Sequence, residues 1–245
     1  MLDRTQPNES MPRALASRLL PRRCVVCGMQ RGLPQTSLCE DCEADFFSVS
    51  RSRCERCAIS LSAAHAGGHR LCGQCLGEPP HFDATTTLAE YVSPIDGMVK
   101  ALKFTARLDL AAFFGRLLAL RVLAQPGAAR VAIVIPVPLA FERVKQRGFN
   151  QSHHIARAFA AASDKRLAAD RLLRVRHTPP QQALALKERR RNVRGAFAVE
   201  GDVDGQTVFV VDDVMTTGST LDEVARVLKR AGAAHVHNLI VARTP

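Results

Sequence analysis

The chain has 245 residues, of which 47% are hydrophobic and 23% are charged, enough for a medium α/β domain with a small additional module. It holds no run near the roughly 20 apolar residues that a membrane-spanning helix needs, and its polar start lacks the apolar centre of a secretory signal, so we expect a cytoplasmic protein without membrane insertion. The net charge is +11, and residues 143–194 alone carry fourteen Lys and Arg against three acidic residues. This basic segment favours an anionic partner such as pyrophosphate, nucleotide or nucleic acid. A solvated arginine-rich surface is the alternative interpretation.

The first third of the chain holds all eight cysteines, arranged as four C-x-x-C pairs. Eleven residues separate the first two pairs and fourteen separate the last two. Two such pairs at this separation place four thiolates at the corners of a tetrahedron, as a closed structural zinc site requires. After a tail, 1–21, we therefore expect a module, 22–80, that folds around two zinc ions rather than around an apolar core. The expected ligands are Cys24, Cys27, Cys39 and Cys42 in one site and Cys54, Cys57, Cys72 and Cys75 in the other.

Three other uses of these cysteines fit less well. Disulfides need an oxidising compartment, and nothing in the sequence directs export. A redox C-x-x-C motif normally occurs once, within a thioredoxin-like pattern, and an iron–sulfur protein would show a ferredoxin spacing. His65 and His69 could replace cysteine ligands in the second site, but four cysteines already complete it.

The rest of the chain, 81–245, predicts an α/β domain. Residues 86–91 are expected to form a strand, and residues 110–123 a mostly apolar helix. Lys100 and Lys103 lie on a short helix before it and could face a ligand cleft.

A second apolar run, 131–135, predicts a buried strand that ends at Pro136. A basic loop, 143–151, leads from it into a helix with Ile155 and Phe159 on one face. A strand, a basic glycine-containing loop and a helix form a typical anion-binding layout. A surface turn is the simpler interpretation of the loop alone.

The basic segment 171–194 contains Pro179-Pro180, which predicts an extended start. Its charges are concentrated in the run 187–191. A solvated arginine-rich helix is the alternative.

The last third predicts a further strand–loop–helix unit. Residues 208–211 form an apolar run typical of a buried parallel strand, and a helix with one apolar face covers 221–228 and can end at Gly232. The loop between them brings backbone N–H groups and hydroxyls to a helix N-terminus, where the dipole favours an anion. Its hydroxyl residues and glycine are Thr216, Thr217, Gly218, Ser219 and Thr220.

Two carboxylates, Asp212 and Asp213, directly precede this loop. They would repel a bare phosphate, but carboxylates accept hydrogen bonds well from vicinal hydroxyls. A phosphate group with a diol nearby describes ribose 5-phosphate. A helix N-cap after an ordinary strand is the alternative interpretation.

Residues 211–220 are similar, position by position, to the phosphoribosyl pyrophosphate (PRPP) signature of type I phosphoribosyltransferases. The order of the cysteine pairs, Pro136-Val137-Pro138, the stretch 147–151 and the acidic pair resembles the ComF family over residues 20–243. The resemblance implies an N-terminal double zinc ribbon, followed by a type I phosphoribosyltransferase-like parallel sheet flanked by helices.

The resemblance also implies roles for the residues of the site. Asp212 and Asp213 would be the catalytic pair that holds the ribose hydroxyls, residues 216–220 would wrap the 5-phosphate, and Arg147 and Gly148 would cradle pyrophosphate. Segment 171–194 would form a lid, and magnesium would accompany PRPP.

Three hypotheses on function remain open at this stage. In the first, the domain is an enzyme that transfers ribose 5-phosphate from PRPP to an unidentified acceptor. In the second, the fold is a non-catalytic module that contacts single-stranded DNA or a DNA-processing protein in natural transformation, a process with which ComF-like proteins are associated. In the third, the domain senses PRPP without turnover.

Overall fold

The computed structural model describes residues 23–29, 37–48, 52–62, 70–125, 132–176 and 193–245. These residues form two compact parts, one that ends at Asp45 and one from Phe46 to Pro245. The expected tail 1–21, His65 and His69, and residues 177–192 of the expected lid lie outside the described residues.

The first part contains the first two C-x-x-C pairs. Helix α2 (Glu40–Phe47) begins directly after Cys39. The N–H of Gly28 donates to the carbonyl of Cys24 at 2.9 Å, and the N–H of Cys42 lies 3.4 Å from the sulfur of Cys39. The second of these contacts directs a backbone N–H group toward sulfur.

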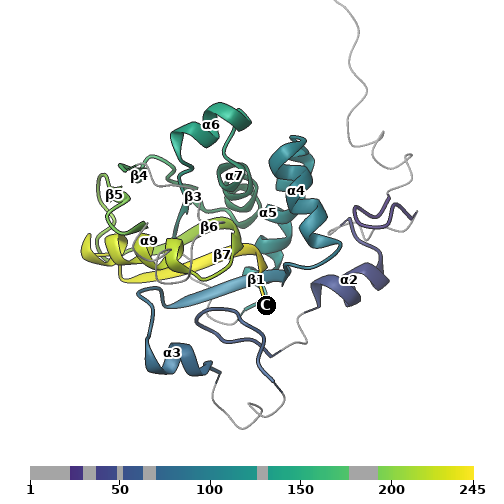
Figure 1. Cartoon of the computed structure of the whole chain (residues 1–245), viewed down its shortest axis with the longest axis horizontal. Helices are drawn as coiled ribbons and strands as arrows, with labels where there is room; N and C mark the ends of the chain where they lie inside the picture. Colours follow the sequence, from purple (N-terminus) through teal and green to yellow (C-terminus); the bar gives the residue numbers. More distant parts are fainter. Residues whose placement is uncertain (1–22, 30–36, 49–51, 63–69, 126–131, 177–192) are drawn as a thin grey trace, which may run out of the picture. The chain divides into compact units, whose positions relative to one another are not determined.

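The larger part is built on a parallel sheet of five strands, in the order β1-β7-β6-β2-β3 (Figure 1). The two central strands, β6 and β7, consist largely of apolar residues that are buried on both faces, as is usual for a parallel sheet. The strands are β1 (Ala84–Glu90), β2 (Ile133–Pro136), β3 (Arg166–Leu167), β6 (Thr207–Met215) and β7 (His235–Arg243).

Helices cover both faces of this sheet. Helices α5 (Leu108–Leu123) and α7 (Gln151–Ser163) pack against each other and against one face, where the rings of Phe159 and Phe209 lie 5.6 Å apart. Helix α9 (Ser219–Arg230) buries Val224 and Leu228 in a core with Val208. Because alternate strand residues point to opposite faces, Val208 and Phe209 serve different layers. The prediction of a parallel α/β sheet flanked by helices is confirmed.

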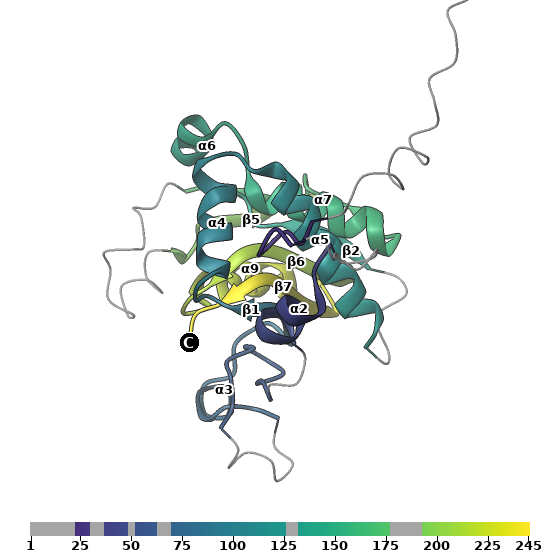
Figure 2. The same ribbon diagram turned by 90° about the vertical axis from the view of Figure 1, so that its right-hand side faces the viewer.

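Two short helices and a hairpin complete the architecture around one end of the sheet. Helix α4 (Ile95–Phe104) precedes α5, and helix α6 (Phe141–Arg147) connects β2 to α7 (Figure 2). Strands β4 (Leu172–Arg174) and β5 (Phe197–Val199) pair in antiparallel fashion on either side of residues 177–192. No helix in the described part of the chain combines the length and the apolar character that crossing a membrane requires.

The second pair of C-x-x-C motifs belongs to the larger part. Helix α3 (Gly73–Gly77) lies within it. The cysteines Cys54, Cys57 and Cys75 are buried in the same apolar cluster as Met215 and Leu221. The predicted module boundary at residue 80 stays a prediction.

Two predicted elements differ from the observed ones. Strand β6 continues beyond Val211 to Met215, because β7 runs beside it and pairs Met215 with Arg243; the acidic pair therefore lies within the strand. The expected basic loop was wrong over its first residues, since α6 extends to Arg147. Its sequence has no glycine or proline before Gly148, whose left-handed φ of 82° ends the helix.

Candidate functional site

A cavity of about 620 Å³ opens at the carboxyl ends of β2 and β6. Adjacent parallel strands deliver their following loops to this edge, which is where open α/β sheets usually bind ligands. Helices α4, α6 and α7, the loop before α9, Tyr91 after β1 and Arg174 of β4 also contribute to the lining. The predicted site residues that line it are Arg147, Asp212, Asp213, Thr216, Thr217, Gly218, Ser219 and Thr220.

The Thr-Gly loop, 216–220, leads from the end of β6 into the first turn of α9. Gly218 has a φ of 80° and caps the helix, and its carbonyl accepts from the N–H of Asp222 at 2.8 Å. The hydroxyls of Thr217 and Ser219 lie 2.9 Å apart. The first residues of the 12-residue helix α9 line the cavity, so its positive dipole end and its first N–H groups favour an anion there.

Both carboxylate oxygens of Asp213 accept hydrogen bonds from other groups of the protein. Its Oδ2 accepts from the side-chain amide of Gln151 at 2.8 Å and from the ammonium of Lys103 at 2.9 Å. Its Oδ1 accepts from the N–H of Val214 at 2.7 Å. The carboxylate is buried, so this residue fixes the geometry of the site as well as lining it.

Asp212 differs from its neighbour. Its Oδ1 accepts from the hydroxyl of Ser152 at 2.8 Å and from the N–H of Asp213 at 2.9 Å. Its Oδ2 has no hydrogen-bond partner among the residues that the structure describes. Burial and the adjacent charge of Asp213 raise the pKa of Asp212 to about 7. The site thus holds one half-buried carboxyl that a hydrogen-bond donor or a cation in the cavity would stabilise as carboxylate.

The start of α7 positions both acidic side chains. Asn150 is the N-cap, since its side chain accepts from the N–H of Ser152 at 3.0 Å. Its amide group also donates to the carbonyl of Val137, at 3.0 Å, and so fastens the helix to the end of β2. This cap places Gln151 and Ser152 beside the acidic pair.

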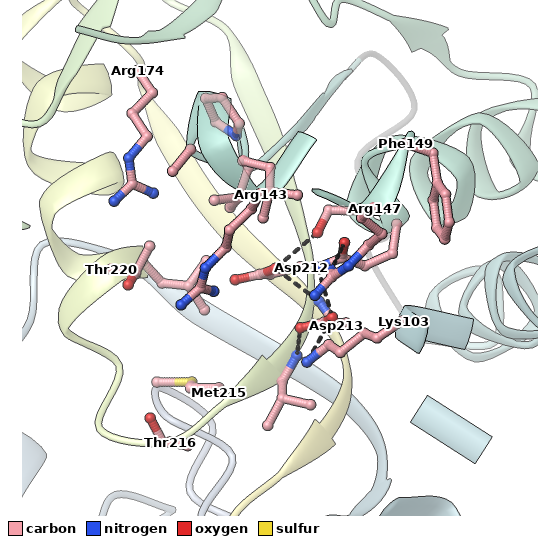
Figure 3. Close-up of a pocket in the computed structure, with 18 of the residues that line it drawn as sticks. Lys103, Arg143, Arg147, Phe149, Arg174, Asp212, Asp213, Met215, Thr216 and Thr220 are labelled. Atoms are coloured by element: carbon pink, nitrogen blue, oxygen red, sulfur yellow. Dashed lines mark hydrogen bonds and ion pairs between the residues drawn. The ribbon is translucent and has the colours of Figure 1, made fainter. Parts of the chain in front are cut away.

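Basic side chains line the cavity around the acidic pair and the Thr-Gly loop (Figure 3). They are those of Lys103, Arg143, Arg147 and Arg174. Burial lowers the pKa of Arg147 and of Arg174, and the charge of Arg143 lowers both further. The ring of Phe104 lies 5.4 Å below the guanidinium of Arg147. Guanidinium groups that repel one another at the mouth of a cavity are a natural partner for a polyanion.

The structure divides the remaining predicted residues. Of the two lysines expected near the cleft, Lys103 reaches Asp213, whereas Lys100 pairs with Asp96 at 2.7 Å on the surface. Gly148 ends α6 and does not line the cavity. Sequence reasoning missed Arg174, Gln151 and Ser152; the N-cap Asn150 was the available signal for the last two.

Each group of four cysteines has the dimensions of a zinc site. The sulfur of Cys27 lies 3.8 Å from that of Cys39, and the sulfur of Cys57 lies 3.6 Å from that of Cys72. Four sulfurs placed ~2.3 Å from a zinc ion are ~3.8 Å apart, and in both groups all four lie within 4.8 Å of one another. All eight cysteines are free thiols. The donor set is therefore complete for two closed, structural zinc sites, as predicted.

Without a metal ion, the thiols of the second group cannot all carry a negative charge at once. Hydrogen bonding from Cys57 lowers the pKa of Cys54 to about 4, and the same contact raises the pKa of Cys57. Burial raises the pKa of Cys75 to about 12. A divalent cation removes this conflict, because it stabilises every ligand as thiolate.

Comparison with known proteins agrees with this architecture. Residues 117–245 match the family described as phosphoribosyl transferase domain, and residues 15–76 match the double zinc ribbon domain. The chain is 34% identical over 228 residues to the DNA utilization protein YhgH of Escherichia coli O6:H1, which covers 92% of this chain and 98% of that protein. The chain belongs to the ComF/YhgH family.

Other members of this family match the chain with lower sequence identity. Competence protein F of Haemophilus influenzae is 29% identical over 229 residues, covering 90% of this chain and 96% of that protein. Competence protein ComFC of Bacillus subtilis is 31% identical over 114 residues, or 46% of this chain and 45% of that protein. The family assignment made from the sequence is confirmed.

Proposed function

We propose that the cavity binds PRPP or a related phosphoribosyl ligand. The 5-phosphate would lie on the Thr-Gly loop at the start of α9, and the pyrophosphate would face the guanidinium groups of Arg143, Arg147 and Arg174. One observation carries the proposal: hydroxyls at a helix N-terminus, a carboxyl with an available oxygen, and mutually repelling guanidiniums line the same cavity. This set matches a ligand with a phosphate, a diol and a second anionic group.

The two aspartates would divide the work of holding the ribose. Asp212 has an oxygen available for a hydroxyl, whereas both oxygens of Asp213 already accept hydrogen bonds. We assign the direct contact with the diol to Asp212. Asp213 would hold Lys103 and Gln151 in place, and could reach a hydroxyl only by sharing its occupied oxygens.

Magnesium would enter with the pyrophosphate of the ligand. Oxygen donors are the ligands that this cation prefers, and it keeps several waters when bound with phosphates. Oδ2 of Asp212 has two lone pairs, so it would accept from the diol and also from a water of the cation at this edge of the sheet. The cation would offset charge on the pyrophosphate, a task shared with the basic residues.

The names of the relatives indicate a cellular process in which the proposed ligand would be used. DNA utilization protein and competence protein F are names that connect those proteins with DNA handling. We propose that this chain serves the same process in the cytoplasm, with single-stranded DNA or a DNA-processing protein as its macromolecular partner.

Calorimetric titration of the zinc-loaded full chain with PRPP and magnesium tests the binding proposal. We expect saturable binding to one site, and Arg143→Ala should weaken it by at least about tenfold because a charge-assisted contact is lost. Arg116→Ala, an equivalent change at an exposed position of α5, is the matched control. Absence of binding by the wild-type chain, or equal affinity of both variants, would contradict the proposal.

Release of pyrophosphate separates the enzyme from the sensor. Incubation of bound PRPP with candidate bases, followed by mass spectrometry, should reveal a ribosylated base and free pyrophosphate if the domain is a transferase. Binding without pyrophosphate release would identify PRPP sensing.

A second candidate function, direct binding of single-stranded DNA, is favoured by exposed aromatic side chains on α4 and α6. Phe104 and Phe141 are 72% and 71% exposed, and Arg147 and Lys145 lie over their rings at 5.4 and 5.8 Å. Exposed aromatic rings beside cations are typical of surfaces on which unpaired bases stack.

Salt dependence tests this candidate. Binding of a fluorescent oligonucleotide should weaken steeply with salt concentration, and Phe141→Ala should weaken it by about fivefold or more. Leu123→Ala removes an exposed apolar side chain from α5 and serves as the control. A flat salt dependence would exclude an electrostatic DNA contact.

A further inference from the structure

Arg243, at the end of β7, connects the second cysteine group to the Thr-Gly loop. Its side chain is buried, with 7% of its surface exposed. Its Nε donates to the carbonyl oxygen of Cys57 at 3.1 Å. Its Nη1 lies within hydrogen-bond distance of three carbonyl oxygens, those of Met215 at 3.1 Å, of Thr244 at 2.6 Å and of Thr216. One guanidinium therefore bridges a zinc knuckle and the segment where β6 becomes the loop.

The Thr-Gly loop separates two cavities. A second cavity, of about 460 Å³, lies behind it and is bordered by Cys57, Cys75 and Arg243. Thr217, Gly218 and other loop residues line both this cavity and the one proposed to hold the ligand. Gly218 and Ser219 are buried, but the two cavities leave parts of the loop without packed neighbours, so hydrogen bonds such as those of Arg243 help to fix its backbone.

The contacts of Arg243 also set the direction of the loop's peptide groups. In a trans peptide the carbonyl and the following N–H point in opposite directions. Because the carbonyl of Thr216 points to Arg243, the N–H of Thr217 points to the side of the loop away from Arg243. The guanidinium of Arg243 thus holds the carbonyl of Thr216 on its own side of the loop. The N–H of Thr217 is left on the other side, available to the proposed ligand.

The buried charge of Arg243 has its natural counter-charge in the second zinc site. No carboxylate in the described part of the chain lies within ion-pair distance of this guanidinium. A zinc ion with four thiolates carries a net charge of about −2, and Cys57, Cys72 and Cys75 all interact favourably with Arg243 as anions. The filled zinc site therefore stabilises the cation that holds the loop.

We infer that Arg243 is a positioning residue through which the second zinc site holds the Thr-Gly loop in the conformation that accepts a phosphate. This inference rests on the proposed binding of a phosphoribosyl ligand. The second zinc site is then part of the ligand site, since a disturbance of the metal reaches the loop through one side chain.

The test uses the full chain and two readouts, one of which needs no ligand. Arg243→Lys keeps the charge but loses the fork that reaches both sets of carbonyls, and Cys75→Ser removes a ligand of the second zinc ion. Arg116→Lys, the same change on the exposed face of α5, is the matched control. The readouts are hydrogen exchange at residues 216–220 without ligand, and the affinity for PRPP with magnesium.

We expect Arg243→Lys to keep two zinc ions per chain and an unchanged far-ultraviolet spectrum. Exchange in the loop should rise at least about tenfold, and the affinity for PRPP should fall by a similar factor. Cys75→Ser should lose one zinc ion and raise exchange in the same residues. In the double variant the two effects should be less than additive, because they act through one contact. Arg116→Lys should match the wild type.

The outcomes separate this inference from the proposed function. If the wild-type chain does not bind PRPP, the proposed function fails, while loop exchange still decides whether Arg243 holds the loop. Unchanged loop exchange in Arg243→Lys, or fully additive effects in the double variant, would overturn the inference even if PRPP binds.

Discussion

Lys103 of α4 and Asp213 of β6 form an ion pair inside the candidate site, with 2.9 Å between Nζ and Oδ2. Gln151 donates to the same oxygen. This pair makes the two neighbouring aspartates unequal, because Asp213 is held by the protein while Asp212 keeps an oxygen for a ligand. The inequality leads to the first prediction.

The two substitutions should affect different properties. Asp212→Asn should lower the affinity for the ligand, and Asp213→Asn should lower the stability of the fold. Asp212→Asn should weaken PRPP binding by at least about tenfold and, near pH 5 where native Asp212 is protonated, should change the free energy of unfolding little. Asp213→Asn should lower the free energy of unfolding by about 2–4 kcal/mol, because an amide leaves Lys103 without its partner and turns an N–H₂ toward other donors. Calorimetry and urea denaturation measure both quantities. The exposed Asp109→Asn is the control, and identical behaviour of the two site variants would contradict the assignment.

The pKa of Asp212 predicts a specific pH dependence of stability. This pKa is raised to about 7 in the native protein, from about 4 in an unfolded chain. Native Asp212 therefore keeps a proton that the unfolded chain releases, and its contribution to stability is lost as pH rises from about 4 to about 7. Between pH 5 and pH 8 the wild type should lose on the order of 1–3 kcal/mol more than Asp212→Asn. Equal losses in urea denaturation would show that Asp212 does not titrate in this range.

Gly218→Ala should damage the Thr-Gly loop. The φ of 80° at this position strains any residue with a Cβ, and an added Cβ would lie 2.5 Å from Cε of Met215. We expect a loss of about 1–2 kcal/mol in stability and clearly weaker PRPP binding. Gly97→Ala, in α4 with open space around the new methyl, should be neutral or slightly stabilising. The same response at both glycines would argue against a special loop conformation.

The two zinc sites should contribute unequally to the stability of the larger part. The second site lies in its apolar core, whereas the first belongs to the part that ends at Asp45. Cys75→Ser should lower the main thermal transition by roughly 10 °C or more, while Cys24→Ser should shift it by less than about 2 °C. Each variant should retain one zinc ion per chain by elemental analysis. Equal shifts would show that both sites stabilise one cooperative unit.

The sequence predicted the elements whose signals are local. The apolar run 208–211 and the cysteine spacing each depend on neighbouring residues, and the fold class and both tetracysteine groups follow from them. The wrong loop assignment over 143–147 had a local cause as well. A solvent-exposed helix without buried residues has no apolar periodicity to reveal it.

The contacts that tune the site were beyond the reach of sequence patterns. Lys103 and Asp213 are 110 positions apart in the chain, and Cys57 and Arg243 are separated by 186. Only the order of the strands brings these residues together. A motif of adjacent aspartates indicates a shared role, and the structure separates the two by their partners.

A crystal of the full chain soaked with PRPP and magnesium tests the central claim most directly. We predict density for a phosphate within hydrogen-bond distance of the N–H groups and hydroxyls of residues 217–220, with a ribose hydroxyl on Asp212. An empty Thr-Gly loop at saturating ligand, or a ligand bound elsewhere on the chain, would contradict the claim.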